Sequence, residues 1–388
     1  MPDFAAAADV LKTLIGFDTT SRGSNLALIE WVEGYLDGLS IPHRRVPNAE
    51  GTKANLVATI GPAEPGGVVL SGHTDVVPVD GQPWSSEPFT LVRRDQRLYG
   101  RGTCDMKGFI ALALATAPEI KAANPKKPVH LAFSYDEEIG CLGAPAMIET
   151  IRRELPTPAL VVVGEPTDME AVSGHKGIST FHVTVVGREA HSSQTQQGVS
   201  ANMVAIKLMA TLVELSERLE READPASPFI PKGATLTIGV VHGGTAHNIL
   251  ARECSFHFDL RCPPGLDPES LLGGVFDLAA ALDREVKARA PEAGVRIARQ
   301  AKVPAFAPEK DGAAEAFARR LAGDNGPARA VSYAAEAGQF QQAGFSTVLC
   351  GPGSIAQAHQ PDEYVEVSQM ERGAAFMNRL VDWARAGE

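Results

Sequence analysis

The sequence predicts an α/β protein in which a mostly parallel sheet is interrupted by an inserted ferredoxin-like α+β domain. Continuous Val, Leu and Ile runs alternate with helical segments early in the chain, as in a parallel sheet covered on both faces. Between residues 178 and 302 the strands alternate in hydrophobicity instead, and the element order is β-α-β-β-α-β. A length of 388 residues favours two domains. We expect a main domain formed by 1–177 and 303–388, with 178–302 inserted.

The first part of the chain contains two predicted helices and two predicted strands. Residues 4–16 and 24–38 have helical periodicity, and Ser24 is a plausible N-cap for the second helix. Short apolar runs predict strands at 54–60 and 67–72. A glycine then opens the helix FIALALATAPEI, whose composition predicts burial on most faces.

Three further apolar runs complete the predicted sheet. Three consecutive acids follow the run 129–135, and the stretch PALVVVGEPT ends its apolar run with a glycine and a glutamate that precedes a proline. After the predicted helix GAAEAFARRLAG, a strand at 346–350 leads into a Gly-rich loop that carries a histidine. Each of these strands therefore delivers a polar side chain at its end.

The inserted segment is predicted to pack strands against helices. The strand ISTFHVTVVG alternates, with Phe181, Val183 and Val185 on one side. A long amphipathic helix follows, and its apolar residues are expected to face inward: Met203, Ile206, Leu208, Met209, Leu212 and Leu215. The strands ATLTIGVVHG and CSFHFDLRC, a helix from Pro268 and the strand GVRIARQ complete the segment.

Composition excludes several classes of partner. A net charge of −11 argues against a nucleic-acid surface, which needs a basic stripe. No run approaches the length of a membrane span, and the N-terminus lacks the basic start and apolar core of a signal peptide. Five cysteines without a CxxC pair favour reduced thiols in the cytoplasm. Cys104 is expected to be a small buried filler, although it precedes Asp105.

Potential metal ligands recur at or just beyond the ends of the apolar runs. They are two histidines and four carboxylates: His73, Asp105, Glu137, Glu138, Glu165 and His359. Ligands of such sheets bind outside the carboxyl ends of the strands, so we expect these groups to form one site. Asp75 lies two residues after His73 and projects to the same side, where it could fix the histidine tautomer.

The types of ligand limit the chemistry. Oxygen and nitrogen donors without a thiolate suit zinc, cobalt or manganese. Five ligands exceed one tetrahedral catalytic zinc but fit two metals if Asp105 bridges them. One of the paired glutamates would then be a ligand and the other a base that moves a proton. Spacing alone leaves open which of Glu137 and Glu138 has which role.

Eight short stretches occur in an order that is typical of one family: SGHTDVVPV, GRGTCDMKG, SYDEEIG, VVGEPT, GREAHSS, HNIL, DLR and QAHQPDEYV. They resemble the dinuclear-zinc peptidase family that includes acetylornithine deacetylase, succinyl-diaminopimelate desuccinylase, aminoacylase and glutamate carboxypeptidase. The resemblance implies two Zn²⁺ per chain, with Co²⁺ or Mn²⁺ as possible substitutes, and a cis peptide bond after the bridging aspartate. The implied ligands are His73, Asp105, Glu138, Glu165 and His359.

The resemblance also assigns roles outside the ligand set. Asp75 would orient His73, and Glu137 would be the general acid and base. In the inserted domain, His191 would supply an oxyanion donor and Arg261 a cation for the substrate carboxylate, with Asn248 nearby. From the residues alone, His191 could equally be a turn histidine and Arg261 a solvated strand residue. A homodimer formed through the inserted domains would cover their exposed edges, and His191 could then act in its own chain or in its partner.

Within the family, Glu165 in GEPT and the stretch EAGQFQQAGF are most similar to the acetylornithine deacetylase subgroup. The expected reaction is therefore metal-dependent hydrolysis of an N-acyl amino acid, N-acetylornithine to ornithine and acetate, in arginine biosynthesis. A desuccinylase, an N-acetylcitrulline deacetylase or a dipeptidase would use the same chemistry. A non-catalytic binding member of the fold is the alternative from another class, but it should have lost ligands or the base.

Overall fold

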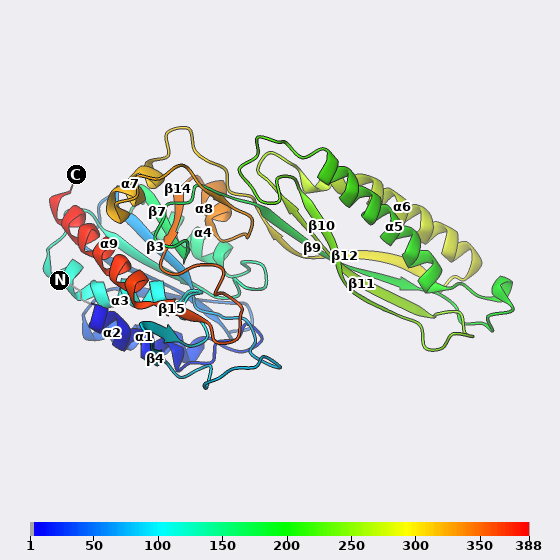
Figure 1. Cartoon of the computed structure of the whole chain (residues 1–388), viewed down its shortest axis with the longest axis horizontal. Coiled ribbons are helices and arrows are strands. Elements are labelled where there is room, and N and C mark those ends of the chain that lie inside the picture. Colours follow the sequence, from blue (N-terminus) through cyan, green and yellow to red (C-terminus); the bar gives the residue numbers. More distant parts are fainter. Residues whose placement is uncertain (1–3, 388) are drawn as a thin grey trace. The chain divides into compact units, whose positions relative to one another are not determined.

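The computed structural model describes residues 4–387, and the chain divides into two compact units (Figure 1). The first unit contains the chain up to Gly174, Phe306–Ala330 and the chain from Ala335 onward. The second unit contains His175–Ala305 and Val331–Ala334, so the predicted insertion 178–302 lies wholly within it. In the described part of the chain, no helix is both long enough and apolar enough to cross a membrane.

The first unit is built on a six-stranded mixed sheet. In spatial order its strands are β1 (His43–Pro47), β2 (Ala54–Ile60), β6 (Val129–Ser134), β3 (Val68–His73), β7 (Leu160–Pro166) and β14 (Ser346–Gly351). The last four are parallel, whereas β1 and β2 form antiparallel pairs. Every residue of β3, β6 and β7 is buried, which explains why their sequences are mostly apolar. The predicted α/β class is confirmed, with a sheet that is mixed at one edge.

Helices cover both faces of this sheet (Figure 1). One face carries α3 (Lys107–Ala122), against which α1 (Phe4–Ile15) and α9 (Val367–Ala386) pack. The remaining helices of the unit are α2 (Leu26–Gly38), α4 (Ala144–Glu154), α7 (Ala313–Ala322) and α8 (Ala337–Gln342). Two small sheets are formed by β4 (Val92–Arg94), β5 (Arg97–Tyr99) and β15 (Tyr364–Glu366), and by β8 (Gly174–His175) and β13 (Ala330–Val331).

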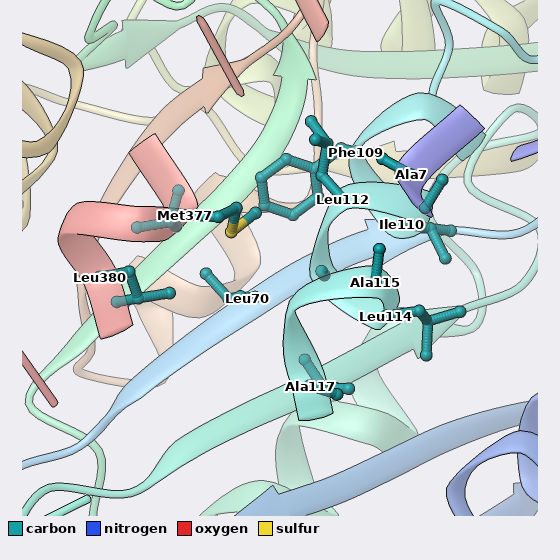
Figure 2. Packing of buried hydrophobic residues seen from close by; sticks show 14 of the residues in the cluster. Ala7, Leu70, Phe109, Ile110, Leu112, Leu114, Ala115, Ala117, Met377 and Leu380 are labelled. Carbon is teal, nitrogen blue, oxygen red and sulfur yellow. The ribbon is translucent and has the colours of Figure 1, made fainter. Parts of the chain in front are cut away.

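The helix α3 is the centre of the core, as its composition predicts. Figure 2 shows its apolar side chains close to Leu70 of β3 and to Met377 of α9. Gly164 of β7 lies directly against the Phe109 ring, because a Cβ at that position would come within 2.0 Å of Phe109 Cγ. Only glycine permits this approach, which brings the strand that carries Glu165 close to α3.

The second unit has a ferredoxin-like sheet, which confirms the sequence prediction. Its spatial order is β10 (Thr235–Gly243), β11 (Glu253–Cys262), β9 (Gly177–Val186) and β12 (Gly294–Val303), with every neighbouring pair antiparallel. The two long helices α5 (Ala201–Arg221) and α6 (Pro268–Arg289) pack on one face, and a 3₁₀ turn spans Thr195–Gln197. The alternation predicted for β9 is present, since Phe181, Val183 and Val185 are buried.

Two local predictions are wrong. The residue before α2 is Asn25 rather than Ser24, so the predicted N-cap is displaced by one residue. The Ser24 oxygen still accepts the N–H of Leu26, the first residue of α2, at 3.2 Å, while its hydroxyl donates to the Thr52 carbonyl. In α5, Met203 is 64% exposed and Ile206 is 51% exposed. The buried stripe of α5 follows different positions: Ala201, Val204, Ala205, Leu208, Leu212, Leu215 and Leu219. Because each residue turns the helix by about 100°, Met203 and Ile206 lie away from that stripe.

Candidate metal centre

Three ligand types meet at the carboxyl end of the sheet in the first unit. His73 ends β3, Glu165 lies near the end of β7, and Asp105 lies in the turn that precedes α3. One ligand atom from each lies within 4.8 Å of the other two. His73 Nε2 is 3.0 Å from Asp105 Oδ1, and all three residues are buried. This arrangement can hold one metal ion.

A second group shares Asp105 with the first. Glu138 follows β6 and His359 lies in the loop after β14, and their ligand atoms meet Asp105 within 4.8 Å. His359 Nε2 is 3.3 Å from Asp105 Oδ2 and 2.9 Å from Glu138 Oε2. The two oxygens of Asp105 therefore face different histidines, which is the geometry required of a carboxylate that bridges two ions.

The carboxylates of these groups fit divalent cations. Glu138 Oε1 and Glu165 Oε1 are buried and have no hydrogen-bond partner among residues 4–387. Burial, followed by the charge of Asp105, raises the pKa of Glu138 to about 7 and that of Glu165 well above its usual value. Four buried carboxylates, with two histidines as their nearest cations, leave an excess of buried negative charge, and a divalent ion at each group would offset it.

The two histidines keep Asp105 ionised. Burial alone would raise the pKa of Asp105, but hydrogen bonds from His359 and His73 hold it below its usual value. Hydrogen bonds to Asp105 and Glu138 in turn raise the pKa of His359 to about 10. Oxygen and imidazole donors of this kind are those that zinc, cobalt and manganese accept.

Glu137 lies beside the cluster but belongs to neither ligand group. The Cys141 thiol donates to Glu137 Oε1 at 3.2 Å. Burial raises the pKa of Glu137 well above its usual value, and the charges of Glu138 and Asp105 add to this although His73 opposes it. Burial thus favours the protonated form of Glu137, and a carboxyl group with a raised pKa in such a cluster is a candidate for proton transfer.

Asp75 makes contacts other than those expected. His73 Nδ1 donates to the Asp75 backbone carbonyl at 2.9 Å, whereas the Asp75 carboxylate is 3.6 Å from the same nitrogen. The carboxylate instead accepts the backbone N–H groups of Glu137 (3.1 Å) and Glu138 (3.2 Å) and the hydroxyl of Ser21 (2.7 Å). Asp75 thus contacts both the histidine, through its main chain, and the acidic turn, through its side chain.

Comparisons with known proteins agree with this geometry. Residues 69–383 match the model of peptidase family M20/M25/M40. The chain belongs to this family. It is 35% identical over 370 residues to an acetylornithine deacetylase of Proteus mirabilis (strain HI4320), covering 94% of this chain and 92% of that protein.

Solved structures of the family share the fold. A tripeptidase from Staphylococcus aureus superposes with a TM-score of 0.75 at 20% identity, over the full length of both chains. A Bacillus subtilis protein described as a dinuclear metal-binding peptidase of the M20 family gives 0.66 at 15% identity, over 97% of each chain. As a family member, the chain is a metal-dependent amidohydrolase. The cis peptide bond Asp105–Met106, expected from the resemblance, is present.

The other predicted residues of this family member lie in the second unit. His191 pairs with Ile249, and the Ser192 backbone N–H donates to the Asn248 carbonyl at 3.0 Å, so His191 and Asn248 lie on adjoining loops. Arg261 lies on β11, where its Nε donates to Asp259 Oδ2 at 2.8 Å. The structure therefore brings His191 and Asn248 together but leaves Arg261 apart from them.

The ring of His191 has a defined tautomer. The Ser193 backbone N–H donates to His191 Nδ1 at 3.2 Å, and the Ser193 hydroxyl is 2.8 Å from the same nitrogen. Because Nδ1 accepts, the proton of the neutral ring is on Nε2. Nε2–H is then the group that can donate to a substrate oxygen.

Sequence reasoning missed Glu336, which is buried at the start of α8 and accepts a hydrogen bond from Ser71, two residues before His73. It also gave no role to Glu363, although the motif QAHQPDEYV contains it. The second omission was avoidable, because an acid four residues after a ligand histidine within a family motif is a recognisable signal.

Proposed function

We propose that this chain removes the acetyl group from N-acetylornithine, releasing ornithine and acetate, as a cytoplasmic enzyme of arginine biosynthesis. The observation that carries the proposal is the pair of ligand groups that share Asp105, with Glu137 beside them. The similarity to acetylornithine deacetylase over nearly the whole chain supports the choice of substrate. Five buried cysteines without a disulfide in the described chain are compatible with a reducing compartment.

We assign two Zn²⁺ ions to the two groups, with Co²⁺ or Mn²⁺ as substitutes. His73 and Glu165 would hold one ion, Glu138 and His359 the other, and Asp105 both. Bound there, the ions would polarise the amide carbonyl and make a water molecule more acidic. The two residues specific to the second ion differ in exposure, since the side chain of His359 is 50% exposed and that of Glu138 is 6% exposed.

Glu137 would then move the proton. Its carboxylate would accept a proton from the attacking water and return it to the departing amine nitrogen. The Cys141 thiol holds one oxygen of this carboxylate, and Asp75 holds the backbone on which it stands. The base is thus fixed in position before substrate arrives, which lowers the reorganisation needed during the reaction.

We further propose that one active site uses both ends of the second-unit sheet. Arg261 pairs with Ile178, at the end where the chain enters and leaves the unit, whereas β11 begins at Glu253 and His191 lies beyond that opposite end. Eight residues of extended strand separate Arg261 from Glu253, roughly 27 Å at about 3.4 Å per residue. An N-acyl amino acid spans only about 10 Å. If Arg261 binds its α-carboxylate, then His191 and Asn248 must come from a partner chain.

A homodimer through the second units supports this arrangement. The edge strand β10 exposes Val240 and Val241, and α5, which packs against β10, exposes Met203, Ile206 and Val213. These residues form an apolar surface along an unpaired strand edge, and a second copy of the chain would cover both the side chains and the edge. We take residues 178–302 as the lid and dimerisation domain.

The experiment is an assay of metal-loaded protein on a panel of substrates. It would include N-acetylornithine, N-acetylcitrulline, N-succinyl-diaminopimelate and dipeptides, each with and without prior treatment by a chelator. We expect the highest kcat/KM on N-acetylornithine, and loss of turnover after chelation with recovery on adding Zn²⁺ or Co²⁺. A higher kcat/KM on another compound of the panel would show that this compound, rather than N-acetylornithine, is the preferred substrate. No turnover of any member by protein that binds metal would favour a binding function instead.

A further inference from the structure

His359 is held differently from the other candidate ligands. His73 and Glu165 stand on buried strands, whose hydrogen-bond ladders fix them. His359 lies in a loop, is half exposed, and has a backbone φ of 64°, in the left-handed region that L-residues rarely adopt. A backbone in that conformation persists only when surrounding contacts fix it.

The buried carboxylate of Glu363, four residues after His359, anchors the loop of Asp105. Glu363 Oε1 accepts the backbone N–H groups of Cys104 (2.9 Å) and Asp105 (3.1 Å). Its Oε2 accepts Gly102 N–H at 3.0 Å and Arg101 Nη1 at 2.7 Å. Four donors thus converge on one side chain, which joins the loop of one ligand to the loop of another.

The chain of contacts continues from Arg101 to the main chain of His359. Arg101 is buried, and its Nη2 donates to Gln82 Oε1 at 2.6 Å while its Nη1 lies 3.3 Å from the Gln360 carbonyl. Gln82 Nε2 donates to the His359 carbonyl at 2.9 Å. The residues Gln82, Arg101 and Glu363, here called the strap, therefore contact the backbone on both sides of the second ligand group.

We propose that the strap consists of positioning residues that set His359 against Asp105 and so determine how tightly the second ion binds. This inference rests on the two-ion assignment made above. None of the three strap side chains belongs to either ligand group, so each acts through the backbone of a ligand residue.

The two ends of the strap should have different effects. Among the ligand residues, Gln82 contacts the backbone of His359 alone. Its loss should therefore weaken the ion held by His359 and Glu138 and spare the other. Glu363 contacts the Asp105 backbone, and Asp105 serves both ions, so its loss should weaken both. A general structural role would weaken both ions in either variant, so the selective effect of Gln82 is the pattern that identifies positioning.

The test is a titration of the full-length protein with Co²⁺ after a chelator has removed bound metal. Calorimetry and the visible absorption of bound cobalt monitor the titration. The variants are Gln82→Ala, Glu363→Gln and, as a matched control, Gln300→Ala, which changes an exposed glutamine on β12. Loss of a residue that positions a ligand typically costs about 10- to 100-fold in metal affinity. We expect Gln82→Ala to raise one of the two dissociation constants about tenfold, with the other constant and the melting temperature as in wild type and in Gln300→Ala.

The outcomes separate this inference from the proposed function, because the titration uses metal alone. Two ions bound by wild type with both constants unchanged in Gln82→Ala would overturn the strap and leave the two-ion assignment in place. A single ion bound by wild type would overturn the assignment and the strap together. Because Gln82 is only partly buried, its variant decides the matter even if Glu363→Gln does not fold.

Discussion

The two units differ in how far most of their candidate functional residues are buried, although His359 of the first unit is half exposed. In the first unit, His73, Asp105 and Glu165 are buried, and Asp75 and its partners fix the surrounding backbone. In the second unit, His191 and Asn248 are exposed. Groups that stabilise charge at a reaction centre act best when they are desolvated and fixed before the reaction. Groups that join a site only after assembly or closure can be exposed to solvent until then. Changes to the buried groups of the first unit should therefore affect chemistry within one chain, whereas changes in the second unit should act only once the site is assembled.

The largest effect is expected at the base. Glu137→Gln keeps the shape of the side chain and its place beside Cys141 but cannot accept a proton. We expect kcat to fall by about 10²–10⁴-fold while metal content is unchanged. The measurements are steady-state kinetics and metal analysis of the same preparation.

The control for that substitution is Glu149→Gln, which changes an exposed glutamate of α4 that pairs with Arg152. It should have wild-type kinetics. If Glu137→Gln lost metal, the functions of Glu137 and Glu138 would have to be exchanged.

The next effect tests whether the exposed histidine completes a partner's site. His191→Ala should lower kcat by about 10²–10³-fold, as removal of an oxyanion donor does. Mixing this inactive variant with inactive Glu137→Ala chains and allowing subunit exchange should restore activity. Random pairing makes half of the dimers mixed, each with one intact site of two, so recovery should approach about a quarter of wild type.

Exchange would be verified by mass spectrometry of differently tagged chains. If subunits exchange but no activity returns, His191 acts in the site of its own chain or has no catalytic role. The inference that the exposed histidine completes a partner's site would then be wrong.

A stability measurement extends the comparison to a buried histidine that has no role in the site. His130 of β6 is fully buried, and burial lowers its pKa to about 4. Below about pH 6.5, His130 binds a proton in the unfolded chain but stays neutral in the folded chain. The unfolding free energy therefore has its whole contribution from His130 above about pH 6.5, and this contribution decreases as the pH falls to about 4. Between pH 7 and 5 this one group should cost about 2 kcal/mol of unfolding free energy.

Denaturant unfolding at the two pH values would measure this difference. His130→Gln should unfold with a smaller dependence on pH than wild type, whereas His242→Gln, at an exposed position of β10 in the second unit, should keep the wild-type dependence. An unchanged dependence in His130→Gln would refute the assignment to His130.

The smallest effect concerns the recognition of a carboxylate by Arg261. Arg261→Lys keeps the charge but loses the planar fork that binds a carboxylate through two parallel hydrogen bonds. KM for N-acetylornithine should rise about tenfold with little change in kcat. On the carboxyl-amidated substrate, the variant and wild type should be alike. A tenfold difference that persisted on the amide would argue against contact with the carboxylate.

The sequence by itself determined the fold class, the insertion and the identity of the candidate ligands. Continuous apolar runs record burial on both faces of a strand, and alternation records burial on one face, so both sheets could be predicted from local patterns. The ligands could be found because the ends of parallel strands meet at one edge. The exposed side of α5 could not be predicted from the sequence. Met203 and Ile206 are apolar but exposed, and only the packing of the helix shows which of its sides is buried.

Only the tertiary structure decided the details of the centre. Asp136 has a φ of 56°, and its turn directs Glu138, rather than Glu137, into a ligand group. The carboxylate of Asp75, more than sixty residues away along the chain, accepts the N–H groups of both glutamates. Of two identical neighbours in sequence, only Glu138 therefore lies in a candidate ligand group, for a reason that is not local. Their directions depend on a backbone held by contacts between distant segments, and no periodicity in the chain encodes those contacts.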